Sequence, residues 1–176
     1  NNKPLPPNGV AFTMDDGFTD QAKIAAPIFL EFNFPVTFFV ITGMLDNKLL
    51  PWDVITSHLI NSSKKESIKL KLPDKTYNFN INETTGRQEA RQIIRDALKM
   101  MSPDYIDNAI TLISQATGEK IPLSPPKEFE PISWDTARQL EHDGVKFAPH
   151  SITHRMLSKL GESVAEEEIM GSWTRL

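Results

Sequence analysis

The 176-residue sequence contains no cysteine, so it forms no disulfide and offers no thiolate to a metal ion. Any metal site must therefore use histidine, aspartate or glutamate. No apolar stretch approaches the roughly 20 residues that span a bilayer, and residues 1–7 lack the apolar centre of a signal peptide. We therefore expect a soluble chain without a membrane span, and cytoplasmic and exported locations both stay open.

Positive charge is also scarce. The net charge is -4, and the longest basic run is the pair Lys64-Lys65. Proteins that bind nucleic acid usually carry a basic face or stripe that neutralises phosphates, so the charge argues against a nucleic-acid partner. With 39% apolar and 24% charged residues, the composition is ordinary for a globular protein. We expect one domain over residues 1–176, and the oligomeric state stays open.

The apolar pattern predicts an α/β fold. Residues Val10 to Met14 read as a strand buried on both faces, Gln21 to Phe32 as a helix and Thr37 to Ile41 as a second strand. This order is a βαβ unit with parallel strands. The pattern resumes with a helix from Trp134 to Asp143, which Ser133 would cap, and a strand from Val145 to Ala148. A last helix would begin at Ser163 with a capping box.

Residues from about 45 to 131 interrupt this rhythm, and we interpret them as an insertion. Alternating apolar residues predict two strands that are joined at Pro73-Asp74-Lys75, a sequence that favours a hairpin turn. Helical periodicity predicts three helices around this hairpin. The expected elements are helices 52–61, 85–101 and 103–117 and strands 68–72 and 77–81.

Two polar clusters carry the candidate chemistry. Asp15-Asp16-Gly17 follows the first strand, and His150-Ser151-Ile152-Thr153-His154 follows the strand that ends at Ala148. Parallel α/β folds place their active sites at the carboxyl ends of strands, so the two clusters should meet. Two histidines and one carboxylate form a three-ligand set that leaves a divalent metal open to water and substrate. The sequence therefore predicts a metal-assisted hydrolase.

These motifs resemble those of the polysaccharide deacetylase family, carbohydrate esterase family 4. The resemblance rests on Met14-Asp15-Asp16-Gly17, on His150-Ser151-Ile152-Thr153-His154 and on the strand sequence Pro35 to Val40. It implies that Asp15 is the catalytic base, and that Asp16, His150 and His154 bind the metal. It also implies a distorted (β/α) barrel. The family's later motifs, which supply a base-orienting arginine and a general-acid histidine, would lie beyond Leu176, so we expect an N-terminal fragment with an incomplete barrel.

The expected activity is the removal of N-acetyl groups from a carbohydrate. One divalent ion, zinc first and manganese or cobalt as alternatives, would activate water, and Asp15 would accept its proton. An amidase or deacylase acting on a non-sugar amide is the first alternative, and a non-catalytic glycan-binding relative is the second. Phosphate-ester hydrolysis ranks last, because the sequence has neither a second metal cluster nor a glycine-rich phosphate loop.

Several other polar and aromatic residues receive structural interpretations. His58 and His142 lie in predicted helices and are excluded as ligands. The acidic run Glu166-Glu167-Glu168 is interpreted as a solvated first turn of the last helix. The three tryptophans, which have the aromatic surface to stack on sugars, are expected to serve packing instead. They are Trp52, Trp134 and Trp173.

Overall fold

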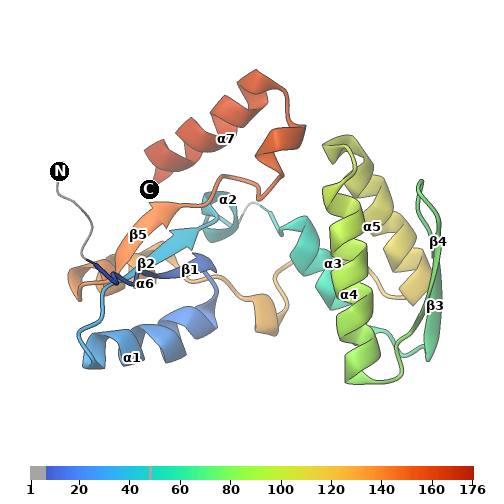
Figure 1. Ribbon diagram of the computed structural model, residues 1–176, viewed down its shortest axis with the longest axis horizontal. Coiled ribbons are helices and arrows are strands. Elements are labelled where there is room, and N and C mark those ends of the chain that lie inside the picture. Colours follow the sequence, from blue (N-terminus) through green and yellow to red (C-terminus); the bar gives the residue numbers. More distant parts are fainter. Residues whose placement is uncertain (1–6, 48) are drawn as a thin grey trace.

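The computed structural model describes residues 7–47 and 49–176, and its elements form two groups that lie side by side (Figure 1). We call the group around the parallel strands β1, β2 and β5 the sheet unit. The helical unit comprises α3, β3, β4, α4 and α5. Most of the N-terminal segment that was expected to lack a signal sequence lies outside the described residues. Among the described helices, none combines the length and the apolar character that crossing a bilayer requires.

The sheet unit is built on three parallel strands in the order β1-β2-β5. Their bounds are Phe12–Asp16, Val36–Val40 and Lys146–Pro149. Asp16 pairs with Val40, and Val40 pairs with Pro149, so the carboxyl ends of all three strands are in register. The predicted α/β class and parallel pairing are confirmed. Within the described residues the sheet is open and does not close into a barrel.

Strand β1 differs from its prediction in position and in burial. It begins at Phe12 instead of Val10 and includes both aspartates, and Val10 and Phe12 are 75% and 40% exposed. The physical reason is its place at the edge of the sheet, where β2 is its sole strand neighbour among the described residues. Central strand β2 matches the prediction better, because Val36, Phe38 and Val40 are buried.

Helices cover both faces of this sheet. In Figure 1 the helix α1 lies on one side of the strands and α7 on the other. The predicted helix from Gln21 starts as the π-helix η1 and continues as α1, and Ser133 caps α6 by accepting a hydrogen bond from the Thr136 amide at 3.0 Å, as predicted. The bounds are Gln21–Ala25 (η1), Ala26–Glu31 (α1), Thr42–Leu45 (α2), Lys127–Phe129 (η2), Trp134–His142 (α6), Leu157–Lys159 (η3) and Glu162–Arg175 (α7).

The capping box predicted for the last helix is wrong. Helix α7 begins at Glu162, its N-cap residue is Gly161, and no side chain caps it. Ser163 therefore lies inside the first turn. The short helix η3 ends at Lys159, so only Leu160 and Gly161 separate it from α7.

The helical unit has a hydrophobic core of its own. Strands β3 and β4 pair antiparallel as the predicted hairpin, and their alternating residues Ile68, Leu70, Tyr77 and Phe79 are buried. These side chains form one cluster with residues of the three helices, whereas residues of β2, α2 and α6 belong to a second cluster. The bounds are Trp52–Ser62 (α3), Ser67–Lys71 (β3), Thr76–Asn80 (β4), Thr84–Lys99 (α4) and Pro103–Thr117 (α5).

Candidate metal centre

The end of β1 turns sharply and places Asp16 at the edge of the sheet. Asp16 and Gly17 have positive φ angles of 79° and 88°. A Cβ atom on Gly17 would lie 2.9 Å from Cγ1 of Val40, so both the backbone angle and the space require glycine. Gln21 holds this turn, because it donates a hydrogen bond to the Asp15 carbonyl at 2.5 Å and accepts one from the Gly17 amide at 3.2 Å.

The loop after β5 carries the two histidines. The amide of His150 donates to the Val40 carbonyl at 2.8 Å, which continues the parallel pairing to the first histidine. Ser151 and His154 have positive φ angles of 62° and 60°, an unusual conformation for residues other than glycine. The amide of His154 donates to the Ser151 hydroxyl at 3.0 Å. Such backbone strain often accompanies functional sites, where neighbouring contacts hold it in place.

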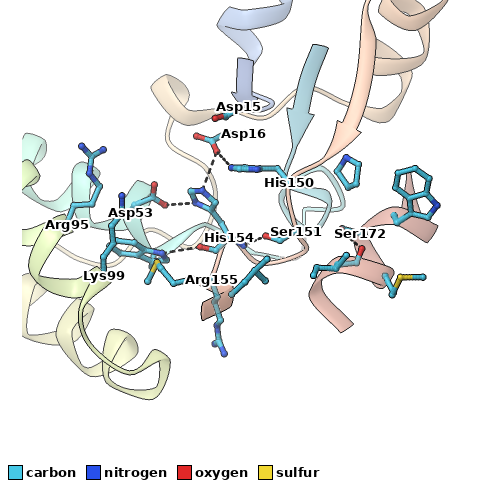
Figure 2. A pocket seen from close by; sticks show the side chains of 17 residues that line it. Asp15, Asp16, Asp53, Arg95, Lys99, His150, Ser151, His154, Arg155 and Ser172 are labelled. Atoms are coloured by element: carbon cyan, nitrogen blue, oxygen red, sulfur yellow. Dashed lines mark hydrogen bonds and ion pairs between the residues drawn. The ribbon is translucent and has the colours of Figure 1, made fainter. Parts of the chain in front are cut away.

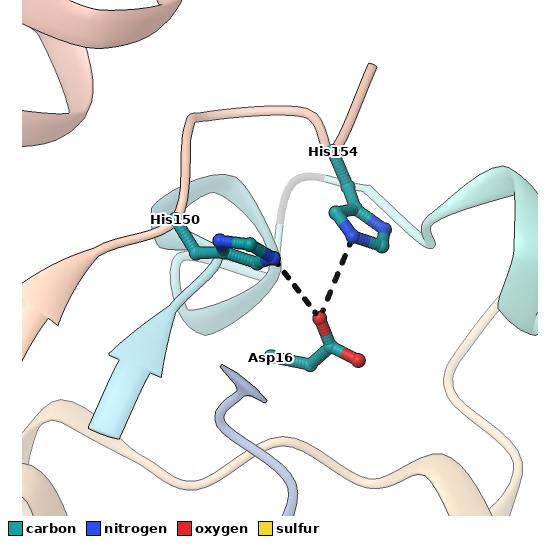
Figure 3. Close-up of side chains that lie close together, drawn as sticks. All are labelled: Asp16, His150 and His154. Carbon is teal, nitrogen blue, oxygen red and sulfur yellow. Dashed lines mark ion pairs between the residues drawn. The ribbon is translucent and has the colours of Figure 1, made fainter. Parts of the chain in front are cut away.

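The structure brings Asp16, His150 and His154 together (Figure 3). The Oδ1 atom of Asp16 lies 3.7 Å from Nε2 of His150 and 3.6 Å from Nε2 of His154. One donor atom from each residue lies within 4.8 Å of the others. Tetrahedral ligands at about 2.1 Å from a zinc ion lie about 3.4 Å apart. The three side chains therefore fit a shared divalent cation.

Burial and nearby charges shift the pKa values of Asp16 and His154, the two most enclosed members of this triad. Burial has the largest effect on Asp16 and raises the pKa of its carboxyl group above 3.8, although the charges of His154 and His150 oppose the rise. Burial alone would lower the pKa of His154. The hydrogen bond and the charge of Asp53, together with the charge of Asp16, outweigh burial and raise the pKa of His154 above 6.5. A cation between these groups would favour the ionised carboxylate and the neutral imidazole.

Asp53 orients His154, a role that no motif in the sequence predicts. Its Oδ1 atom lies 3.2 Å from Nδ1 of His154, so the tautomer protonated at Nδ1 donates to Asp53 and turns Nε2 toward Asp16. Burial, the largest effect, raises the pKa of Asp53, but the hydrogen bond and charge of His154 lower it below 3.8 overall. Trp52 donates from its indole to the His154 carbonyl at 3.3 Å. Nothing in the sequence around Asp53 indicated this contact.

Glu168 holds the same loop from the opposite side, and its interpretation as a solvated residue is wrong. The side chain is 5% exposed, and its carboxylate accepts hydrogen bonds from the amides of Ile152 and Thr153 at 2.8 and 2.9 Å and from the Thr153 hydroxyl. Its neighbours Glu166 and Glu167 are exposed, as predicted. Because Ile152 and Thr153 lie between the two histidines, Glu168 fixes the backbone that carries both candidate ligands.

A cavity of about 750 Å³ opens beside the triad (Figure 2). Asp15 lines it together with Asp16, and Arg95 and Lys99 of α4 lie on the far side of Asp53 from the triad. Another wall is apolar and comes from the segment around η3 and from α7. Its large side chains are Met156, Leu157, Ile169, Met170 and Trp173.

The three tryptophans differ in their surroundings. Trp52 is buried in the core of the helical unit, and Trp134 packs on the sheet cluster while its indole donates to Asp46 at 2.7 Å, so both serve packing as predicted. The same prediction is wrong for Trp173, which is 68% exposed at the cavity wall. The two histidines that were excluded as metal ligands lie beside other carboxylates. Nδ1 of His58 lies 3.4 Å from Oε1 of Glu128, and Nδ1 of His142 lies 3.5 Å from Oδ1 of Asp143.

Comparison with protein families matches residues 2–176 to the polysaccharide deacetylase family. Comparison with curated proteins finds no match. Among solved structures, the chain is similar to the BpsB deacetylase domain from Bordetella bronchiseptica, with 19% identity and a TM-score of 0.37. That alignment covers 87% of this chain and 34% of the BpsB chain, so this chain spans about a third of its length. Because the family match extends over nearly every residue, the chain belongs to the polysaccharide deacetylase family.

Proposed function

We propose that this protein is a metal-dependent hydrolase that removes N-acetyl groups from a carbohydrate. The observation that carries the proposal is the convergence of Asp16, His150 and His154, with donor atoms within 4.8 Å of one another, beside a cavity of about 750 Å³. Membership of the polysaccharide deacetylase family supports the same reaction class. The candidate ligands and the adjoining space therefore support hydrolysis of a sugar amide.

The donor set favours a borderline divalent ion. Two imidazole nitrogens and one carboxylate suit zinc first, with manganese or cobalt as alternatives, and the cavity leaves a side open for water and substrate. Such an ion supplies Lewis-acid polarisation of the amide carbonyl and lowers the pKa of water. Asp53 holds the ring of His154, and Glu168 holds the backbone between the two histidines, which supports a fixed ligand geometry.

Asp15 is the proposed general base. It lines the same cavity as Asp16 and is exposed there. Within the described part of the chain, no hydrogen bond or ion pair engages its carboxylate, while Gln21 holds its backbone carbonyl. The carboxylate is therefore available to accept a proton from the attacking water, and the turn at Gly17 fixes its position next to the metal ligands.

The exposed Trp173 gives the cavity a surface for a sugar ring. Aromatic faces pack well against the apolar face of a pyranose, and Met170 on the same helix extends this wall. The polar triad on the other side would receive the acetamide group. This division of the cavity supports a carbohydrate over a small amide, which would leave the apolar wall uncovered.

The experiment is acetate release from N-acetylated oligosaccharides by the metal-loaded protein and by its Asp15→Asn variant. Loss of a general base costs about 10²- to 10⁴-fold in rate. We expect the variant to keep about one metal ion per chain and to lose activity by that factor. Asp20→Asn, an exposed aspartate outside the cavity, is the matched control and should behave like the unmodified protein.

Other outcomes would identify the alternatives. Activity on small amides without activity on sugars would favour an amidase or deacylase. Glycan binding without acetate release under zinc, manganese and cobalt would favour a binding module. An Asp15→Asn variant that releases acetate at the original rate would show that Asp15 is not the base.

A further inference from the structure

Helix α4 carries a basic residue at every fourth position, so that four cations share one face of the helix. The first of them has a structural task. Arg87 donates hydrogen bonds to the carbonyls of Ile60, Asn61 and Ser63 at 2.5 to 2.9 Å, and it thereby satisfies the carboxyl end of α3. The series continues along the helix toward the metal centre. Its members are Arg87, Arg91, Arg95 and Lys99.

The last two members of this series line the cavity of the metal centre. Arg95 and Lys99 are both exposed, and Figure 2 shows them beside Asp53, on the side of the triad opposite Ser172. A second cavity of about 310 Å³ adjoins the first, and Arg95 and Asp53 line both. Two cationic groups, one helical turn apart, therefore border the space next to the metal ligands.

Among the described residues, Arg95 and Lys99 form no ion pair with a carboxylate. Arg95 donates to the side chain of Gln92, and neither Arg95 nor Lys99 lies within 4.0 Å of a carboxylate oxygen there. Asp53, the nearest acidic wall residue on this side, already pairs with His154. Arg91, which lines the second cavity, has a buried Nε atom without a hydrogen-bond partner among the described residues. Salt bridges among the protein's own side chains thus do not explain the series.

We propose that Arg95 and Lys99 form a subsite for an oxyanion carried by the carbohydrate, a carboxylate or a phosphate group on a sugar near the acetamide. This inference rests on the proposed function, because it assigns the substrate class of the same cavity. Guanidinium groups bind carboxylate and phosphate in a bidentate fork, and an ammonium group adds a point charge. The protein as a whole has a net charge of -4 and three aspartates line the same cavity, so the attraction for an anionic glycan would be confined to the wall that carries Arg95 and Lys99.

The experiment measures dissociation constants of the metal-loaded protein for three oligosaccharides of equal length. One is neutral and N-acetylated, one carries a carboxylate on the neighbouring sugar, and one carries a phosphate there. The double variant Arg95→Gln with Lys99→Gln removes the proposed subsite. The control variant, Lys69→Gln with Lys71→Gln, removes the same charge from the exposed face of β3.

We expect the unmodified and control proteins to prefer one anionic oligosaccharide over the neutral one. In the Arg95 and Lys99 double variant, this preference should fall about tenfold, because both charged contacts to the anionic group are lost. If the preference for the carboxylate-bearing oligosaccharide falls further than that for the phosphate-bearing one, the subsite binds a carboxylate. The opposite result identifies a phosphate. Higher salt should weaken the preference in the unmodified protein. Metal content should be equal in all three proteins, since neither Arg95 nor Lys99 binds the ion.

Two results would overturn the subsite. One is an unmodified protein that binds all three oligosaccharides equally, and the other is a control variant that loses as much preference as the double variant. Acetate release, measured separately, distinguishes the two hypotheses. Selective binding without acetate release leaves the subsite standing and refutes the hydrolase, whereas acetate release without selective binding does the reverse.

Discussion

The sheet unit and the helical unit contribute different things to one site. The sheet unit supplies all three candidate ligands, and two strand ends and one loop of strained backbone hold them in place. The helical unit supplies side chains that act on those ligands from outside, Asp53 on His154 and the cations of α4 on the cavity. The comparison shows that the candidate ligands belong to the sheet unit, whereas their environment comes from both units, with Glu168 from α7 and Asp53 from α3.

The two units also differ in how they are stabilised. The sheet cluster centres on β2, where Phe38 and Val40 are fully buried, and the helical cluster centres on Ile94, Leu98 and Ile113. Between them, the contacts at the metal centre run from Trp52 and Asp53 to His154. A sequence change at these two residues of the helical unit can therefore alter the surroundings of His154 from outside the sheet unit.

The largest expected effect is the loss of metal on removing a ligand of the sheet unit. In Asp16→Ala the two imidazoles remain without the carboxylate ligand, although His154 keeps Asp53 at its other nitrogen, so metal content should fall from about one ion per chain to none. Metal analysis of protein purified without chelator measures this. Asp20→Ala, an exposed aspartate near the same turn, should keep its metal. Unchanged occupancy in Asp16→Ala would rule out this ligand set.

A smaller loss is expected from Glu168→Gln, which weakens the contacts that hold the histidine loop. The Glu168 carboxylate accepts three hydrogen bonds, two from backbone N–H groups and one from a hydroxyl. The glutamine side chain has a single acceptor oxygen for these three donors. Changes in such supporting contacts typically lower metal affinity about 10- to 100-fold, and we expect a value in this range by competitive titration with a chelator. Glu167→Gln, on the exposed side of α7, should leave the affinity unchanged.

The Asp53→Asn substitution lies in the helical unit and should lower metal affinity about tenfold. This value is the lower end of the 10- to 100-fold range expected for supporting contacts. The substitution removes the carboxylate that raises the pKa of His154, so in the metal-free protein that pKa should fall. A chelator titration and an NMR titration of the His154 ring measure the two effects. Asp107→Asn, exposed on α5, is the control. A loss as complete as that of Asp16→Ala would contradict the division between ligands and environment.

The smallest expected effect is a pH-dependent change in stability of the metal-free protein. The Asp53 carboxyl has a pKa below 3.8 and the His154 imidazole a pKa above 6.5, so both are charged and paired between these values. The stabilisation is lost as the pH falls through the lowered pKa of Asp53 and as it rises through the raised pKa of His154. Urea unfolding should therefore show the largest difference from Asp53→Asn between pH 3.8 and 6.5. A difference that is independent of pH would contradict the ion pair.

Much of the secondary structure followed from local patterns in the sequence. The alternation in β3 and β4, the proline-containing turn between them and the Ser133 cap each predict an element that the structure contains. Predictions weakened where the neighbours of a segment decide its state. Strand β1 is exposed because it lies at the edge of the sheet, and Trp173 is exposed because the helix that carries it turns that side toward the cavity.

The sequence by itself determined the candidate donors and their approximate places, because Asp15, Asp16 and His150 close or directly follow apolar runs that can form parallel strands, and His154 lies four residues after His150. Only the tertiary structure decided which residues surround them. Asp53 reaches His154 across 101 positions, Glu168 turns inward from an acidic run, and α4 brings its cations to the cavity. Periodicity is a property of neighbouring residues, whereas these contacts depend on how separately packed groups of elements meet, which no local pattern encodes.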